Sequence, residues 1–324
     1  MSNLKDIKKP VSAHLREFNK VFRASVKSNT ALLDIIMRYI LKSKGKQMRP
    51  VIVLYSAGLT GEINTTSYRA ATLVELLHTA TLVHDDVVDD SYQRRGRFSI
   101  NAIWRNKIAV LAGDFLLSRG MLLAVENGDY KMLEIVSRAV KEMSEGELLQ
   151  IEKARKLDID EEVYYDIIRR KTASLLASCF AVGAVSAGAD EEVVKKMYEI
   201  GENLGMAFQI KDDLLDFGEG SDIGKPTGID IKEKKMTLPL IYLLNNSNLK
   251  DKRRFINIVK NNNNNRKKVN ELINHVRESG GIDYAIEKMH AFKQNALDML
   301  NSFPDSLSRQ MLQEMVNFTI ERKK

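Results

Sequence analysis

Apolar side chains recur every three or four positions through most of this chain, which is the spacing of one face of an α-helix. No alternating stretch long enough for a useful strand is present, and no repeat of about 20–50 residues is found. The pattern therefore predicts a single all-α domain over residues 1–324. The predicted helices cover residues 31–41, 50–59, 67–90, 108–125, 131–153, 158–189 and 191–217, and a final pair begins at Gly280 and Gly281 and is interrupted near Pro304.

Two of the predicted helices end in a cluster of aspartates. The helix over 67–90 is apolar on nearly every side, as expected of a buried central helix. In each cluster the outer two aspartates are four positions apart, so their Cβ atoms would lie about 5–6 Å apart on one face. The clusters are Asp85, Asp86 and Asp89, and Asp212, Asp213 and Asp216.

Carboxylates at this spacing repel one another, and burying them without compensation costs on the order of several kcal/mol. A solvated acidic surface would explain one cluster. Two clusters of the same spacing, each next to apolar sequence, indicate a bound cation instead. Carboxylate oxygens are hard ligands that suit Mg²⁺ better than Zn²⁺, and Mg²⁺ held by two facing clusters would in turn bind a diphosphate.

Basic side chains gather in irregular segments beside these helices. Three of them flank Gly96 directly after the first cluster, and guanidinium groups bind phosphate oxygens in pairs. A long Gly-rich loop after the second cluster is also basic, and loops of this length are usually functional. The group around Gly45 can equally be a solvated charged loop. These three groups are Arg94, Arg95 and Arg97; Lys225, Lys232, Lys234 and Lys235; and Lys42, Lys44, Lys46 and Arg49.

Single polar residues on apolar helices add to this pattern. His78 lies two helical turns before Asp85 on the same face, so it is either a core histidine or a substrate contact. Lys171 and Thr172 would lie on the inner face of a helix that is otherwise apolar.

Composition and charge restrict the class of protein. The chain has 50 Lys and Arg against 43 Asp and Glu, a net charge of +7 that fits an anionic substrate or transient contact with an anionic membrane surface, without arguing for nucleic acid. The single cysteine, Cys179, excludes an intramolecular disulfide and suits a reducing compartment. The N-terminus lacks the apolar core of a signal peptide, and the longest uncharged run, 173–189, contains serines and predicts no transmembrane span. We therefore expect a cytoplasmic protein.

Taken together, the motifs resemble those of the trans-type polyprenyl diphosphate synthases, nearly end to end. This resemblance implies a bundle of long antiparallel helices around a deep central cavity, usually in a homodimer, with about three Mg²⁺ ions per active site. Five motifs occur in the expected order: GKQMRP; HTATLVHDDVVD followed by RRG; KTA; FQIKDDLLD; and GKPTGIDIKEKKMTLP.

The resemblance also implies roles for individual residues. Asp85, Asp89 and Asp212 would bind Mg²⁺, while Asp86, Asp213 and Asp216 complete the clusters. The diphosphate of an allylic substrate would be held by Arg94, Lys171, Thr172, Gln209 and Lys225, with Lys235 as a further contact. Isopentenyl diphosphate would be held by Lys46, Arg49, His78 and Arg95. Lys44 and Lys234 stand where the family usually has glycine, at positions that supply no side-chain ligand.

The implied reaction is ionisation of the allylic diphosphate, followed by attack of the double bond of isopentenyl diphosphate on the allylic cation. Ala80 and Thr81 are small where short-chain members often carry an aromatic residue, which leaves a passage open below Asp85. We therefore expect a long-chain product of about seven to nine isoprene units, about C35–C45, grown from farnesyl diphosphate in an apolar cavity. Met206, or residues near Phe115 and Leu148, would form a deeper floor.

Three alternatives stay open at this point. The first is a short-chain synthase that makes farnesyl or geranylgeranyl diphosphate. The second is a class I terpene cyclase, which would need neither the GKxxRP element nor the RRG element. The third is a partner subunit of a heteromeric synthase, which would be expected to lack one of the aspartate clusters. Whether the product becomes a quinone side chain or another lipid does not follow from the residues.

Overall fold

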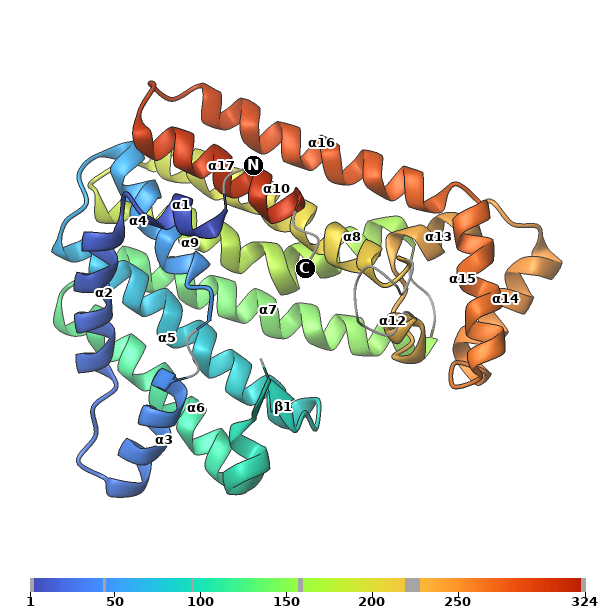
Figure 1. Cartoon of the computed structure of the whole chain (residues 1–324), viewed down its shortest axis with the longest axis horizontal. Helices are drawn as coiled ribbons and strands as arrows, with labels where there is room; N and C mark the ends of the chain where they lie inside the picture. The colour runs from blue at the N-terminus through green and yellow to red at the C-terminus, as the bar shows by residue number, and fades with distance from the viewer. Residues whose placement is uncertain (1–2, 43–44, 95, 157–159, 219–227, 322–324) are drawn as a thin grey trace.

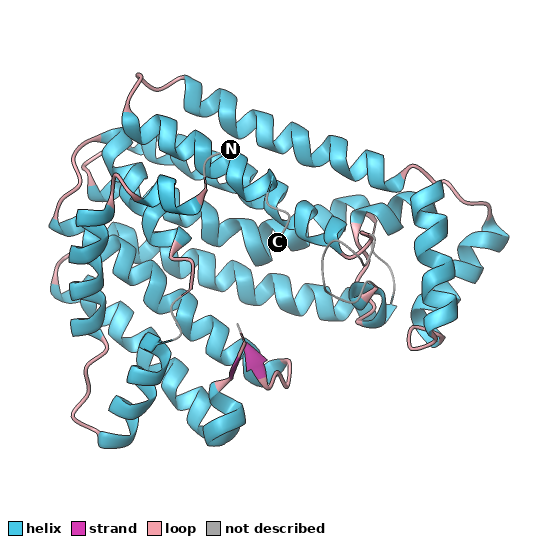
Figure 2. Ribbon diagram, in the orientation of Figure 1, coloured by secondary structure: helices cyan, strands magenta, loops and turns pink. Residues whose placement is uncertain are grey.

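The computed structural model describes residues 3–42, 45–94, 96–156, 160–218 and 228–321, and it confirms the all-α prediction. Long helices run side by side along the molecule, and one short hairpin of two strands projects from it (Figures 1 and 2). The elements are α1 (Leu4–Lys8), α2 (Ser12–Ser25), α3 (Ala31–Lys42), α4 (Met48–Thr60), α5 (Thr65–Val88), β1 (Gln93–Arg94), β2 (Arg97–Phe98), α6 (Ile100–Glu126), α7 (Tyr130–Lys156), α8 (Glu161–Ile168), η1 (Arg169–Ala173), α9 (Ser174–Ser186), α10 (Glu191–Leu215), α12 (Ile229–Lys232), α13 (Leu238–Asn245), α14 (Leu249–Asn261), α15 (Arg266–Glu278), α16 (Gly281–Asn301) and α17 (Leu307–Glu321).

Helix α5 lies inside the bundle, as its apolar sequence predicts. It packs against α6 on one side and against α4 and α9 on others, while α10 lies between α9 and α16. One large apolar cluster joins α4, α5, α9 and α10, and a second joins α8, α10 and the C-terminal helices α13 to α16. The C-terminal ends of α5 and α10, which carry the aspartates, therefore project from a rigid core.

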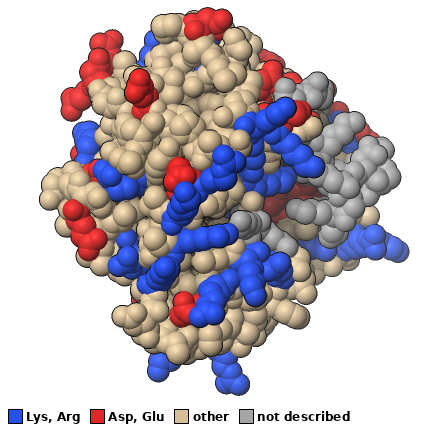
Figure 3. Space-filling model, turned by 60° about the vertical axis from the view of Figure 1, so that its left-hand side comes forward, with Lys and Arg blue, Asp and Glu red and all other residues tan. Residues whose placement is uncertain are grey.

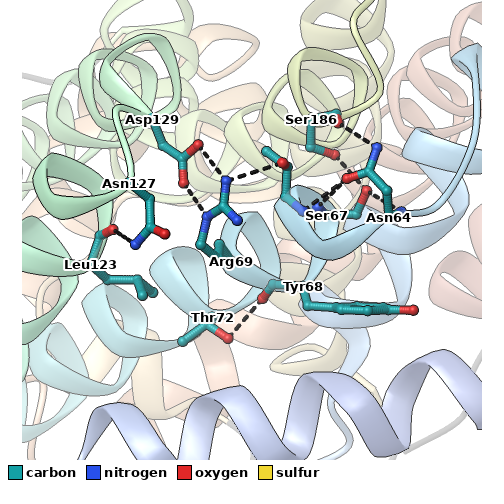
Figure 4. Close-up of polar contacts among 10 residues, drawn as sticks. Asn64, Ser67, Tyr68, Arg69, Thr72, Leu123, Asn127, Asp129 and Ser186 are labelled. Atoms are coloured by element: carbon teal, nitrogen blue, oxygen red, sulfur yellow. Dashed lines mark hydrogen bonds and ion pairs between the residues drawn. The ribbon is translucent and has the colours of Figure 1, made fainter.

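The N-terminal end of α5 is fixed by a polar network at the opposite end from the aspartates (Figure 4). Asn64 caps the helix by accepting hydrogen bonds from the Thr66 and Ser67 amides, and its side-chain amide donates to the Ser186 carbonyl at the end of α9. Arg69 donates two hydrogen bonds, of 2.6 and 2.9 Å, to the carboxylate of Asp129, which lies in the turn between α6 and α7. These contacts fix where α5 begins.

Two predicted helices differ from the observed ones. Helix α6 begins at Ile100, because the segment before residue 108 is also helical, but the two parts are joined at Arg105, which has φ 68° and ψ 166°. The predicted helix over 158–189 is divided into α8, the π-helical turn η1 and α9. Single π-helical turns inside α-helices are frequent at functional sites, and η1 contains Lys171 and Thr172.

Helix α6 meets the length and hydropathy criterion for a membrane span, which core helices of soluble proteins also meet. Within its most apolar stretch 33% of the residues are buried, along the side that packs on α5. The opposite side exposes a stripe of large apolar side chains at helical spacing. They are Ile103, Val110, Leu111, Met121, Leu122 and Val125.

Candidate active site

The first aspartate cluster divides into exposed and buried members. Asp85 and Asp89 are exposed at the C-terminal end of α5, whereas Asp86 is only 4% exposed. Asp86 accepts a 2.6 Å hydrogen bond from Nε of Arg94 in β1, so it holds the hairpin against α5. The backbone carbonyl of Asp86 also accepts a hydrogen bond from the Asn101 side chain. Asp85 and Asp89 are thus available to a ligand, and Asp86 positions an arginine.

The second cluster repeats this division on α10. Asp212 is exposed, and Asp213 is buried. The Asp213 carboxylate accepts hydrogen bonds from the Tyr164 hydroxyl at 2.8 Å and from the Gln209 amide at 2.9 Å. Thr172 in turn donates to the Gln209 side-chain oxygen at 2.8 Å, so a continuous chain of hydrogen bonds connects η1 to α10.

Asp216 has a different neighbourhood from its counterpart Asp89. Its two carboxylate oxygens accept hydrogen bonds from the backbone amides of Ile229 at 2.9 Å and Asp230 at 3.2 Å. Asp216 therefore holds the first turn of α12 against the end of α10. The expectation that Asp216 completes the second aspartate cluster stays a prediction, and the structure shows that its carboxylate also anchors the neighbouring segment.

Lys171 lies between the two clusters. Its Nζ forms an ion pair with Glu147 and a 3.4 Å contact with Gln150, both on α7. Helix α7 can come this close because it has Gly146 there: a Cβ at this position would lie 2.9 Å from the backbone nitrogen of Lys171. The charge of Lys171 acts on Asp85, and the same side chain lines a cavity with Asp212.

That cavity, of about 250 Å³, is the acidic cavity of the site. It combines three aspartates with two lysines and several hydrogen-bonding side chains. Its polar lining consists of Gln150, Tyr164, Lys171, Thr172, Gln209, Asp212, Asp213, Asp230, Lys235 and Thr237. Of the residues predicted to hold the allylic diphosphate, the structure therefore brings Lys171, Thr172, Gln209 and Lys235 together. Lys225 lies outside the described residues.

The carboxylates here hold excess negative charge. Burial raises the pKa of Asp213 to about 7 and that of Asp230 to about 6, and neighbouring carboxylates add to both shifts. Partial burial and the nearby Asp89 also raise the pKa of Asp85. Burial alone would lower the pKa of Lys235, but its contacts with Glu233 and Asp230 outweigh this and raise it. A cation bound at this site would relieve the repulsion among the carboxylates.

The donor set suits a hard divalent cation that shares its ligands with a substrate. Among the described residues, no group of three or more acidic, histidine or cysteine side chains forms a complete metal cage. Mg²⁺ rarely needs one, because it commonly binds one or two carboxylates and completes its shell with water and phosphate oxygens. The exposed carboxylates Asp85, Asp89 and Asp212 offer oxygens of this kind, from the ends of two different helices.

A second cavity, of about 120 Å³, lies on the other side of Asp86 between α2, α3, α5 and the hairpin. His78 and Arg94 both line it, and His78 is 8% exposed. Arg94, expected at the allylic diphosphate, therefore shares a cavity with His78, expected at isopentenyl diphosphate. Arg49 is half-buried at the start of α4, Lys46 is exposed just before that helix, and Arg95 lies outside the described residues.

The surface beside this second cavity is basic. Helix α2 exposes three basic side chains on one face, Arg16, Lys20 and Arg23, and Lys27 is exposed just after the helix ends. Arg23 also lines the cavity. Lys and Arg side chains gather across the face of the molecule that carries α2 (Figure 3). Such a surface raises the local concentration of anionic substrates.

The residues below Asp85 have distinct environments. Thr81, one turn below Asp85 on the same face, is half-buried, and its hydroxyl donates to the His78 carbonyl at 2.9 Å. Ala80 is fully buried in an apolar cluster with residues of α3 and α6. Met206 is buried in the second apolar cluster. Leu148 is 67% exposed on α7, and the expectation that residues near it form a deeper floor stays a prediction.

Four residues of the site were not assigned from the sequence: Glu147, Gln150, Tyr164 and Asp230. Asp230 lies within the last of the five motifs, close in sequence to Lys232 and Lys235. A carboxylate within this basic segment was a sequence signal from which Asp230 could have been assigned to the site. Tyr164 has no such signal, because its contact with Asp213 joins residues 49 positions apart. Glu147 and Gln150 reach Lys171 only because α7 packs closely on η1.

Comparison with known proteins agrees with this geometry. The polyprenyl synthetase family model matches residues 30–276. The chain belongs to the polyprenyl synthetase family. Among curated members, it is 34% identical to the heptaprenyl diphosphate synthase component 2 of Bacillus subtilis, over 92% of this chain and 85% of that protein. It is also 34% identical to an all-trans-nonaprenyl-diphosphate synthase of Rhodobacter capsulatus, over 98% and 97% of the two chains.

Solved structures of the family have the same fold. A decaprenyl diphosphate synthase from Rhodobacter capsulatus superposes with a TM-score of 0.93 at 33% identity, over 99% of this chain and 100% of that one. A Caulobacter crescentus polyprenyl synthase, complexed with calcium and isoprenyl diphosphate, has a TM-score of 0.89 at 33% identity, over 99% and 98%. A geranylgeranyl pyrophosphate synthetase from Pyrococcus horikoshii has a TM-score of 0.89 at 30% identity, over 98% and 99%. The protein is a prenyltransferase of this family, whose members make short and long chains.

Proposed function

We propose that the enzyme is an all-trans polyprenyl diphosphate synthase that adds isopentenyl diphosphate units to an allylic diphosphate, farnesyl diphosphate in the first instance. The observation that carries this proposal is the pair of exposed aspartate groups at the ends of α5 and α10, with Lys171 between them. Carboxylates at two helix ends can bind divalent cations, and these cations together with the nearby Lys171 would hold a departing diphosphate.

In this proposal Asp85, Asp89 and Asp212 would hold Mg²⁺, about three ions per site, which would stabilise the charge on the departing diphosphate. The Caulobacter protein, which is complexed with calcium and isoprenyl diphosphate, supports the use of a divalent cation. Lys171 and Lys235 donate to the diphosphate oxygens. Thr172 and Gln209, which already hydrogen-bond to one another, orient that group.

Isopentenyl diphosphate would occupy the second cavity, where His78 and Arg94 lie. Lys46 and Arg49 would hold its diphosphate, with Arg95. In this proposal the double bond would lie near the allylic carbon, and such positioning replaces a bimolecular encounter. The Phe18 and Phe22 side chains line the same cavity and help to exclude water, which would otherwise quench the allylic cation.

Incubation of the purified chain with farnesyl diphosphate, labelled isopentenyl diphosphate and Mg²⁺ tests this function. We expect dephosphorylated products of about C35–C45, because Ala80 and Thr81, before Asp85, are small where an aromatic side chain would close the passage. A product that ends at C15 or C20 would establish the short-chain alternative. Absence of any product from the chain alone would favour the partner-subunit alternative instead.

The apolar stripe of α6 supports a homodimer. Six large apolar side chains on one helical face, exposed in the monomer, form a surface of the kind that a second copy buries. One relative is named as a component of its synthase, so a different partner chain on this face is the second candidate.

We further infer a cytoplasmic enzyme that contacts a membrane surface transiently when it releases its product. A long prenyl chain is insoluble in water, and the net charge of +7 favours an anionic surface. A quinone side chain is one use of such a product.

A further inference from the structure

A third cavity, of about 390 Å³, adjoins the acidic cavity and has the opposite charge. It lies between the C-terminal end of α7, the turn after α12 and the end of α14. Four basic side chains and a single acidic one line it. The lining residues are Gln150, Ile151, Ala154, Arg155, Glu233, Lys234, Lys235 and Lys260. We call it the basic cavity.

The two cavities share part of their walls. Gln150, Ala154 and Lys235 line both of them. Lys235 forms ion pairs with Asp230, which lines the acidic cavity, at 3.6 Å and with Glu233, which lines the basic cavity, at 2.6 Å. An anion that leaves the acidic cavity past Lys235 therefore enters the basic one.

The positive charge of the basic cavity is largely uncompensated. Its one acidic residue, Glu233, is already paired with Lys235. No ion pair joins Arg155, Lys234 or Lys260 to an acidic side chain within the part of the chain that the structure describes. Arg155, Lys234 and Lys260 repel one another in this cavity, because the carboxylate of Glu233 is already paired with Lys235, and a bound polyanion would remove that repulsion.

Local structure holds these cations in place. Lys234 has a φ of 59°, a left-handed conformation that L side chains rarely adopt. The Asn263 side chain donates to the Lys232 carbonyl at 2.6 Å, which ties the turn between α14 and α15 to the end of α12. This contact brings the end of α14, with Lys260, over the turn that carries Lys234. Asn263, within the asparagine run over 261–265, thus helps to hold this wall in position.

We propose that the basic cavity is a second diphosphate site, which receives the diphosphate group beside the reaction centre. This proposal rests on the proposed function, because that reaction releases a diphosphate at the acidic cavity in every cycle. The group could arrive as free inorganic diphosphate or as the head of a prenyl diphosphate, for which Ile151 and Ala154 offer an apolar wall. The recognition chemistry is the same in both cases: a compact polyanion surrounded by guanidinium and ammonium groups.

Calorimetric titration of inorganic diphosphate into the full chain, in EDTA, tests this site without relying on catalysis. The double variant Arg155→Gln/Lys260→Gln removes two cations that the reaction does not use. Arg266→Gln/Lys267→Gln is the matched control, since both side chains are exposed on α15 outside the cavity. The difference between wild type and the first variant isolates the basic cavity, whatever other site also binds diphosphate.

We expect the wild type and the control to bind diphosphate equally. The cavity variant should lose one binding event, or bind at least about tenfold more weakly, because two charge-assisted hydrogen bonds are removed. Equal binding by all three proteins, or equal loss in both variants, would overturn the proposal. Circular dichroism checks that each variant is folded.

Titration with farnesyl diphosphate as a second probe distinguishes free inorganic diphosphate from the head group of a prenyl diphosphate as the ligand of the basic cavity. A difference between wild type and cavity variant with inorganic diphosphate identifies free diphosphate as a sufficient ligand. A difference with farnesyl diphosphate alone identifies the prenylated head group. Failure of the proposed function would appear separately, as absence of prenyl products from the wild-type enzyme.

Discussion

At the scale of single residues, the two aspartate clusters are alike in their first two positions and differ in the third. The first aspartate of each is exposed, and the second is buried against a specific partner, Arg94 or Tyr164. The third is exposed at Asp89, whereas Asp216 anchors α12. Removing different aspartates should therefore have different effects.

Asp85→Asn and Asp212→Asn should each lower kcat about 10²–10³-fold, since each removes a charge that stabilises the transition state. Thermal stability should be unchanged or slightly higher, because repulsion is relieved. Asp216→Asn is the comparison: it should lower the free energy of unfolding by about 1–3 kcal/mol through weakened contacts with α12. Steady-state kinetics and denaturant unfolding of the three variants test this, and equal kinetic effects with equal destabilisation would contradict it.

Thr81→Phe should shorten the product toward about C15–C20. Thr81 lies on the face of Asp85 and is half-buried, so an aromatic ring there would fill the passage below the aspartate. Ala80→Phe should shorten it too, but with a loss of stability of about 1–3 kcal/mol, because Ala80 is fully buried. Chromatography of dephosphorylated products measures both, and unchanged chain length in both variants would refute this prediction.

Without metal, the free energy of unfolding should fall as the pH rises from about 4 to about 7. The pKa of Asp213 is raised to about 7 and that of Asp230 to about 6. In this window the folded chain binds more protons than the unfolded chain, so a rise in pH favours unfolding. Thermal unfolding at pH 5 and 7.5 in EDTA measures the slope, which Asp230→Asn should reduce. A slope of the opposite sign would contradict the burial of these carboxylates.

At the scale of elements, helix α5 is anchored at one end and functional at the other. Asp129→Ala should lower the free energy of unfolding by about 2–3 kcal/mol, because it leaves the largely buried Arg69 without its hydrogen-bonded partner. The KM for isopentenyl diphosphate should stay within about twofold, since the site lies at the other end of the helix. Denaturant unfolding and steady-state kinetics test both parts, with the exposed Asp298→Ala on α16 as control.

An element could be predicted from the sequence where nearby residues specify it, and could not where contacts with residues far along the chain specify it. The ends of α5 and α10 follow from local apolar periodicity, so their aspartates could be placed from the sequence. The π-helical turn that carries Lys171 could not, because it depends on the close approach of α7 at Gly146. The roles of Asp216 and Tyr164 likewise come from contacts with residues 13 and 49 positions away.

At the scale of the whole molecule, the apolar stripe on α6 predicts association. Leu111→Lys, near the middle of that stripe, should convert a dimer into a monomer, because it places a charge in an interface of apolar side chains. Leu249→Lys is the matched control, since Leu249 is 76% exposed at the start of α14. Light scattering after gel filtration gives the mass, and a monomeric wild type would contradict the prediction.

The distribution of charged residues over the molecule is consistent with anionic substrates. Acidic helix ends, a basic cavity beside them and a basic face along α2 would together attract, hold and release anionic substrates. The proposed function depends on a divalent cation that would join the two aspartate clusters through a diphosphate.

A crystal structure with Mn²⁺ and a non-reactive analogue of farnesyl diphosphate tests that claim most directly. Anomalous scattering should show metal ions bound by Asp85 and Asp89 from α5 and by Asp212 from α10, with the diphosphate of one ligand between them. Metal bound to only one of the two clusters, or a diphosphate held without contact to either, would contradict the account.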